Sequence, residues 1–136
     1  MATVHLEYTS GLRTTMTHLQ SGSIVITDAP TDNKGKGEAF SPTDLVAAAL
    51  ASCMLTTMGI AGQEHGFVLD GAKASVTKIM ASSPRRIAEV QILIDFPDIA
   101  YSEKQKAIMQ KIAASCPVAL SLNPKLKQSV QLNYKY

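Results

Sequence analysis

Two cysteines, Cys53 and Cys116, are the residues of this chain whose chemistry could matter most. A thiol buried in apolar surroundings is normally inert, whereas a thiol near a cation and within reach of a second thiol can serve as a redox centre. Cys53 lies inside a long uncharged segment, where a lone cysteine most often fills space in the core. The spacing along the chain does not show whether the two thiols meet, so both interpretations stay open.

Cys116 differs from Cys53 because Pro117 follows it directly. The residue before a proline is disfavoured in helical geometry. We therefore expect Cys116 to lie at the end of a helix, with a side chain that is partly exposed.

Arg13 is the cation that could support thiol chemistry. It follows Gly11 and Leu12 at the start of a predicted strand, and it is one of only three arginines. A guanidinium can stabilise a thiolate and a peroxide oxygen through charged hydrogen bonds. A surface charge at the end of a strand is the other interpretation, and the sequence leaves both open.

Other kinds of site are disfavoured. Together with the cysteines, His5, His18 and His65 show none of the close paired spacings of zinc sites, so we expect no metal and no cofactor. The net charge of +2 is small and the lysines are scattered, which argues against a nucleic-acid partner.

Length and composition predict one globular domain over residues 1–136, with 46% hydrophobic and 18% charged residues. The uncharged segment 45–62 is just long enough to span a membrane. It is rich in Ala, Ser, Thr and Gly, however, which favours a buried central helix and no membrane partner. No secretory signal is predicted at the N-terminus, and two cysteines without one indicate a reducing, cytoplasmic location.

Hydrophobic periodicity predicts an α+β fold with two helices packed on antiparallel sheet. The helix of the uncharged segment has a strong start signal at Ser41 to Asp44, and Gly66 is its expected terminator. Ser102 and Gln105 predict the cap of the second helix. The expected strands are residues 3–8, 13–19, 23–27, 67–80, 87–96 and 129–134, and the expected helices are 41–64, one beginning after 102, and a short one at 118–122.

Four short segments resemble the OsmC/Ohr family of osmotically inducible and organic hydroperoxide resistance proteins. They are residues 27–30 (TDAP), 41–45 (SPTDL), 50–53 (LASC) and 116–118 (CPV). The resemblance covers essentially the whole chain in the same order of elements, and it is closer to the OsmC-like branch. It implies an OsmC-like fold, in which antiparallel sheets wrap two central helices of an intertwined homodimer.

The resemblance also implies a thiol peroxidase that reduces organic hydroperoxides. By this similarity Cys53 would be the peroxidatic thiolate and Cys116 the resolving thiol, with a disulfide between them that a cellular dithiol reduces. Arg13 would lower the pKa of the Cys53 thiol and stabilise the departing alkoxide. Phe40, Met54 and Met58 could form an apolar pocket for an alkyl peroxide.

One position departs from the family pattern. Thr43 stands where the peroxidases carry a glutamate that holds the arginine. Glu38 and Asp44 are the candidate replacements for this carboxylate. The alternative function is a non-catalytic OsmC-like dimer that binds a small apolar ligand or partner, with cysteines that only pack in the core.

Overall fold

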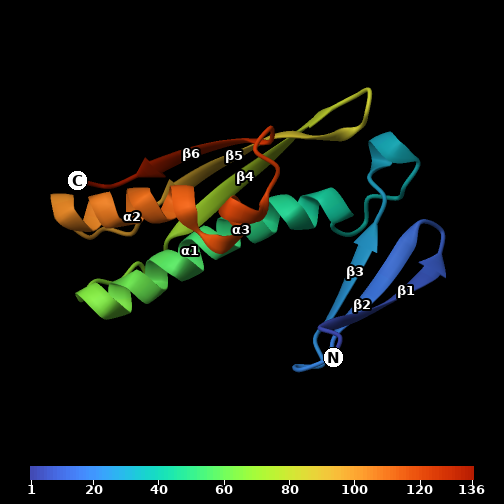
Figure 1. The fold of residues 1–136 in the computed structure, drawn as a ribbon, viewed down its shortest axis with the longest axis horizontal. Helices are drawn as coiled ribbons and strands as arrows, with labels where there is room; N and C mark the ends of the chain where they lie inside the picture. The colour runs from blue at the N-terminus through green and yellow to red at the C-terminus, as the bar shows by residue number, and fades with distance from the viewer. The chain divides into compact units, whose positions relative to one another are not determined.

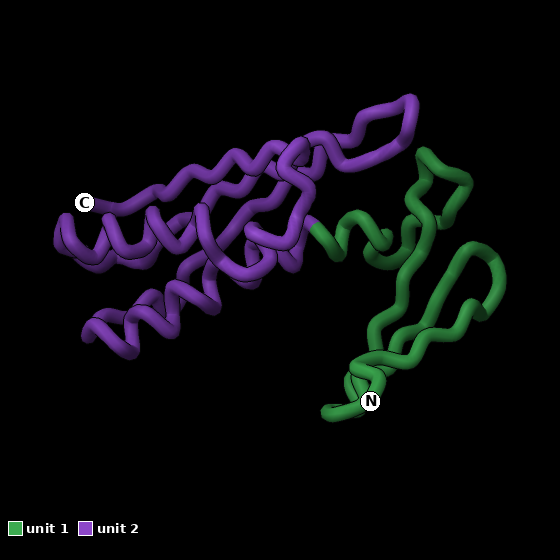
Figure 2. The backbone as a smooth tube through the Cα atoms, in the orientation of Figure 1, with its two compact units in different colours: residues 1–46 green, residues 47–136 purple.

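The structure is a computed structural model that describes all of residues 1–136. The chain forms two compact units, residues 1–46 and 47–136, and the boundary falls within the long helix α1 (Figure 2). The prediction of a single domain stays a prediction. In chain order the elements are β1 (Val4–Ser10), β2 (Arg13–His18), β3 (Ile24–Asp28), a 3₁₀ turn (Thr31–Asn33), α1 (Pro42–His65), β4 (Lys73–Ala81), β5 (Arg86–Asp95), α2 (Glu103–Ser115), α3 (Pro117–Ser121) and β6 (Lys127–Asn133).

The first unit contains the predicted antiparallel meander, in the order β1-β2-β3 (Figure 1). The loop between β2 and β3 is longer than a two-residue turn. The hydrogen bond that closes it runs from the His18 N–H to the carbonyl of Ser23, at 2.8 Å. This loop sets the register of the hairpin. As a result, Arg13 at the start of β2 lies directly opposite Asp28 at the end of β3.

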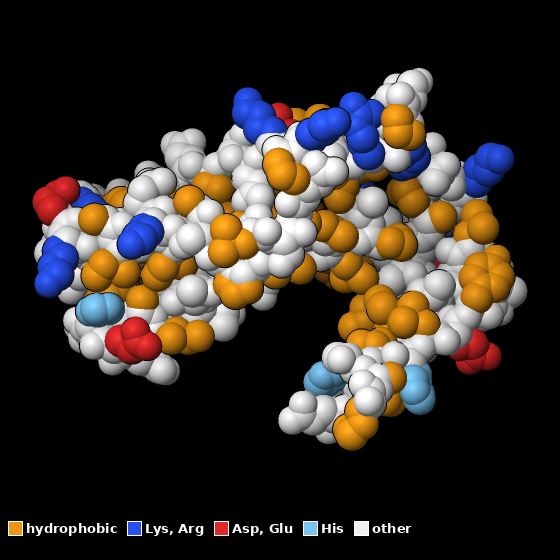
Figure 3. Space-filling model, in the orientation of Figure 1, with side chains coloured by type: hydrophobic (Ala, Val, Ile, Leu, Met, Phe, Trp, Pro, Cys, Tyr) orange, Lys and Arg blue, Asp and Glu red, His pale blue; other side chains and the backbone are white.

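One face of this sheet carries apolar side chains. Leu6, Met16 and Val25 stand opposite one another in a row across the three strands. Leu6 is 61% exposed and Tyr8, next on the same face of β1, is 64% exposed. Figure 3 shows hydrophobic side chains gathered on the surface of this unit. The sheet therefore leaves apolar surface uncovered, which is unfavourable in water.

The helix α1 begins and ends as its sequence predicts. The Asp44 N–H donates to Ser41 Oγ at 3.0 Å, and the Ser41 N–H donates to the Asp44 carboxylate at 2.9 Å. Gly66 ends the helix with a positive φ of 76°, a conformation that favours glycine. Length and composition alone would let α1 cross a membrane, but core helices of globular proteins pass the same test.

The second unit packs helices on the sheet β4-β5-β6 (Figure 1). Val90, Ile92 and Ile94 alternate along β5 and are buried in one core with residues of α1 and α2. β4 and β5 pair antiparallel as predicted, whereas β5 and β6 pair in parallel. The expectation of purely antiparallel sheets thus misses β6, which follows a crossover through α2 and α3.

One strand boundary differs from the prediction, and one helix cap agrees with it. The strand expected over 67–80 begins only at Lys73, because the preceding residues form a turn in which the Ala72 N–H donates to the Leu69 carbonyl at 2.9 Å. Ser102 and Gln105 form the reciprocal cap of α2, as predicted.

Candidate functional site

Cys116 joins α2 to α3. Its backbone is extended, with φ −65° and ψ 154°, as expected for a residue before Pro117. Its N–H donates to the carbonyl of Ile112 at 2.9 Å and so closes α2. The side chain is 0% exposed, so the expectation of partial exposure is wrong: the turn from α2 into α3 directs the thiol into the core.

Cys53 lies near the middle of α1 and is half-buried, packed against the same core. The Thr57 hydroxyl, one turn further along, donates to the Cys53 carbonyl at 2.8 Å. It also lies 3.9 Å from the Cys53 sulfur. Since the hydroxyl has one proton and the carbonyl oxygen is much nearer, the contact with the sulfur is the weaker of the two.

The structure brings the two thiols together. Burial disfavours the thiolate of Cys53, but hydrogen bonding from the Val118 N–H and the Cys116 thiol, with the weaker contact of the Thr57 hydroxyl, outweighs it and lowers the pKa of Cys53. Burial raises the pKa of Cys116, and the neighbouring Cys53 sulfur raises it further. Because the two pKa values shift in opposite directions, Cys53 is the thiol that ionises first, and Cys116 keeps its proton to higher pH.

The start of α3 contributes to this arrangement. Pro117 occupies the first helical position and has no N–H, so Val118 and Ala119 carry the first backbone donors of the helix. The Val118 N–H favours the thiolate of Cys53, and both N–H groups partly offset the rise in the pKa of Cys116. The start of α3 thus favours the ionised form of both sulfurs, and it does so more effectively for Cys53, whose pKa is lowered.

Arg13 lies in the first unit, where it is paired with carboxylates. Its Nε donates to Asp28 Oδ1 at 2.7 Å and its Nη2 to Asp28 Oδ2 at 2.9 Å, which is a bidentate ion pair. The hydrogen bonds from Arg13 hold the pKa of the Asp28 carboxyl below its ordinary value, against the effect of burial. Asp28 was not among the predicted site residues.

The two carboxylates proposed from the sequence have different surroundings. Glu38 Oε2 lies 3.6 Å from Arg13 Nη2, so Glu38 forms a second, longer ion pair with the arginine. Asp44 accepts the capping hydrogen bond from the Ser41 N–H at the start of α1. The structure therefore brings Glu38 to Arg13 and uses Asp44 in a helix cap.

The residues expected to form the substrate pocket do not share one kind of environment. Met54 and Met58 are fully buried on α1 and belong to the core of the second unit. Phe40, in the first unit, is 55% exposed and its backbone forms an isolated bridge with Thr27 of β3. Within the second unit, the two methionines serve as packing residues.

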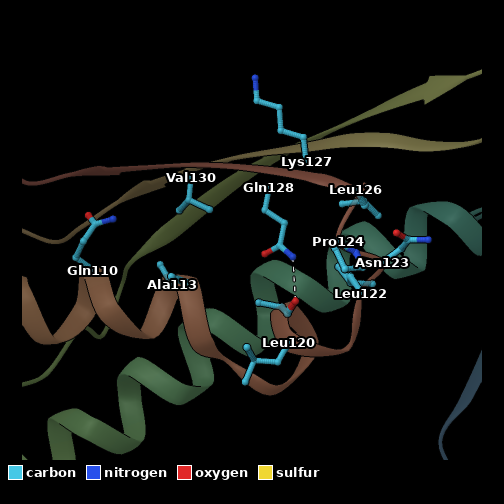
Figure 4. A pocket seen from close by; sticks show the side chains of 12 residues that line it. Gln110, Ala113, Leu120, Leu122, Asn123, Pro124, Leu126, Lys127, Gln128 and Val130 are labelled. Atoms are coloured by element: carbon cyan, nitrogen blue, oxygen red, sulfur yellow. Dashed lines mark hydrogen bonds between the residues drawn. The ribbon is translucent and has the colours of Figure 1, made fainter.

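A groove of about 590 Å³ that the sequence did not predict lies between α2, α3 and β6 (Figure 4). Gln128 reaches across it from β6, and its Nε2 donates to the Ala119 carbonyl of α3 at 3.0 Å. Leu120, Leu122 and Val130 supply apolar lining, but neither cysteine lines it. The hydrogen bond ties α3, and with it the Cys116 turn, to the sheet.

Comparison with known proteins places this chain in a family. The sequence profile of the family described as OsmC-like protein matches residues 35–131, which include both cysteines. The chain belongs to the OsmC-like protein family. Comparison with curated proteins gives no significant match.

Solved structures of OsmC-like proteins have the same fold. A candidate osmotic stress induced and detoxification response protein from Psychrobacter arcticus 273-4 is 48% identical over 98% of this chain and 96% of its own, with a TM-score of 0.93. An organic hydroperoxide resistance protein OsmC from Legionella pneumophila is 14% identical over 98% of both chains, with a TM-score of 0.76. The organic hydroperoxide resistance protein OhrB of Bacillus subtilis is 16% identical over 97% of this chain and 98% of its own, with a TM-score of 0.65. The α+β fold of the OsmC/Ohr proteins, predicted from the sequence, is therefore confirmed.

Proposed function

We propose that this OsmC-like protein is a cysteine-based thiol peroxidase that reduces organic hydroperoxides. The observation that carries the proposal is that two reduced thiols pack in one core and shift each other's pKa values in opposite directions. A nucleophile needs the lower pKa, because the thiolate is the attacking species. A resolving thiol can stay protonated until the first step is complete.

The chemistry balances with a hydroperoxide and a dithiol as co-reactants. The Cys53 thiolate attacks the terminal peroxide oxygen, the O–O bond breaks, and the alkoxide leaves and takes up a proton to become the alcohol. Cys53 is then a sulfenic acid. The Cys116 sulfur attacks the Cys53 sulfur, a disulfide forms and water leaves. A cytoplasmic dithiol reduces the disulfide and is itself oxidised, which returns both thiols to the starting state.

Arg13 is assigned to the Cys53 thiolate in this proposal. Its guanidinium would stabilise the thiolate and the alkoxide that develops on the departing oxygen. Relatives with organic hydroperoxide resistance in their names support the substrate class, and this chain shares their fold. The alternative, a non-catalytic ligand-binding dimer whose cysteines only pack in the core, gives no role to the opposite pKa shifts of the two thiols.

The proposal includes a homodimer. In the apolar row of Leu6, Met16 and Val25, the first and last side chains are exposed, and a second copy of the chain would cover them. α1 supports this, because its exposed residues include Ser52 and Thr56 and it carries no charge from Leu45 to Gln63. Small uncharged side chains let a second helix approach closely.

Turnover with a dithiol tests the proposed function. The wild-type protein with dithiothreitol should consume cumene hydroperoxide, and Cys53→Ser should abolish this consumption because it removes the nucleophile. Cys116→Ser should reduce the first equivalent of peroxide but stop at the sulfenic acid, which dimedone labels. Equal consumption by wild type and Cys53→Ser would rule out Cys53 as the peroxidatic residue.

A further inference from the structure

We infer that Asp28 is the residue that positions Arg13, in place of a carboxylate at position 43. The inference deepens the proposed function and rests on it, because it concerns the arginine assigned to the Cys53 thiolate. Thr43 has no charge, so the chain must hold the guanidinium in another way. Asp28 lies opposite Arg13 in the pairing of β2 with β3, and its carboxylate faces that side chain.

Asp28 holds Arg13 through a bidentate ion pair, which we call the clamp. Both carboxylate oxygens of Asp28 accept from Arg13, at 2.7 Å from Nε and 2.9 Å from Nη2. The carboxylate is itself fixed, because Oδ2 also accepts from the Glu38 N–H at 3.1 Å. The Asp28 side chain is 1% exposed, whereas that of Arg13 is 35% exposed. A buried acceptor thus anchors a partly exposed cation.

The clamp leaves one part of the guanidinium for a ligand. Asp28 occupies the Nε and Nη2 edge, and Nη1 has no hydrogen-bond partner in the chain. A guanidinium has five N–H donors in a rigid plane, so fixing one edge also fixes the direction of Nη1. Nη1 is then already oriented to donate to a peroxide or alkoxide oxygen, so little conformational entropy is lost when it does so.

Glu38 is the weaker candidate for this role. Its carboxylate is 64% exposed and lies 3.6 Å from Nη2, beyond hydrogen-bonding distance. An exposed pair at this distance is screened by water and fixes no direction. Glu38 contributes more through its backbone N–H, which holds the carboxylate of Asp28 in place.

The test measures two quantities in each variant: the rate of peroxide reduction and the hydrogen bonding of the Arg13 guanidinium. The first readout is the second-order rate constant of the reduced protein with cumene hydroperoxide. The second is the ¹⁵N NMR signal of the Arg13 Nε–H, which should exchange slowly with water while Asp28 accepts it. Asp28→Asn should lower the rate constant on the order of 10- to 100-fold and remove the slowly exchanging signal. Glu38→Gln should lower the rate constant less than Asp28→Asn does.

Two further variants make the result specific. Arg13→Lys keeps the charge but lacks the planar fork, so its rate constant should fall as far as that of Asp28→Asn, and it tests the clamp even if Asp28→Asn does not fold. Asp95→Asn is the matched control, because Asp95 is also a strand aspartate that accepts from the residue opposite it, Asn133, at 2.6 Å. This control should keep the rate constant and the Arg13 signal of the wild type.

The outcomes separate the inference from the proposed function. If the wild type does not react with hydroperoxide, the proposed function fails, and the positioning role of Asp28 in it fails as well. If the wild type reacts and Arg13→Ala is slow, but Asp28→Asn or Arg13→Lys reacts as fast as the wild type, the function stands and the inference is overturned. An unchanged Arg13 Nε–H signal in Asp28→Asn would also overturn it.

Discussion

The two cysteines acquire different roles from their surroundings. Cys53 is half-buried, with a pKa that neighbouring Val118 and Cys116 lower against the effect of burial, whereas Cys116 is fully buried at the turn between two helices. The sequence predicted the extended backbone of Cys116, because that depends only on Pro117. It could not predict the contact of the two thiols, which depends on how α3 packs beside α1 in the second unit.

The opposite pKa shifts predict how the thiols react with iodoacetamide. A lowered pKa means that the Cys53 thiolate forms at lower pH, so its alkylation rate should rise and level off below the ordinary thiol pKa of about 8.5. Cys116, with its raised pKa, should be alkylated only at higher pH and more slowly. Rates at each site, measured by mass spectrometry of peptides over a pH series, check both statements.

Cys116→Ala provides the control for this pH profile. It removes the thiol that donates to the Cys53 sulfur, so the midpoint for Cys53 should move to higher pH. The same midpoint for both cysteines in the wild type would contradict the assigned roles.

The elements were more predictable than their pairing. The caps of α1 and α2 follow from local signals at Ser41 to Asp44 and at Ser102 with Gln105, and both are present. The partner of Arg13 depends on register. A two-residue turn at Ser21 and Gly22 would have set Arg13 opposite Pro30, but the longer loop sets it opposite Asp28. A sequence pattern that leaves loop length open therefore misses Asp28.

The apolar face of β1 predicts the assembly of the protein. Leu6→Lys places a charge in the row that a second copy is proposed to cover, so it should convert a dimer into a monomer. Glu7→Lys is the matched control, because residue 7 is next on the strand and points to the opposite face. Light scattering after size-exclusion chromatography measures both masses. A monomeric wild type, or a Leu6→Lys variant that stays dimeric, would contradict this assignment.

At the level of the whole molecule, the OsmC-like fold supplies a scaffold and local residues decide what it does. One unit holds the paired thiols, and the other holds Arg13 with its clamp of Asp28. The family could be predicted from the flanks of the two cysteines, and the match over residues 35–131 confirms it. The carboxylate paired with Arg13 could not, because Thr43 departs from the pattern of the peroxidases, and Asp28, although it lies in the family-like segment 27–30, is recognised as the partner of Arg13 only from the strand pairing.

Oxidation of the reduced protein by one equivalent of t-butyl hydroperoxide tests the proposed chemistry most directly. Intact-mass measurement and thiol counting are made after the reaction, with circular dichroism to show that the protein is still folded. We predict that both thiols are lost, that the mass falls by two hydrogen atoms, and that a peptide linking Cys53 to Cys116 appears. A folded protein whose Cys53 stays reduced and alkylatable in excess hydroperoxide would contradict it.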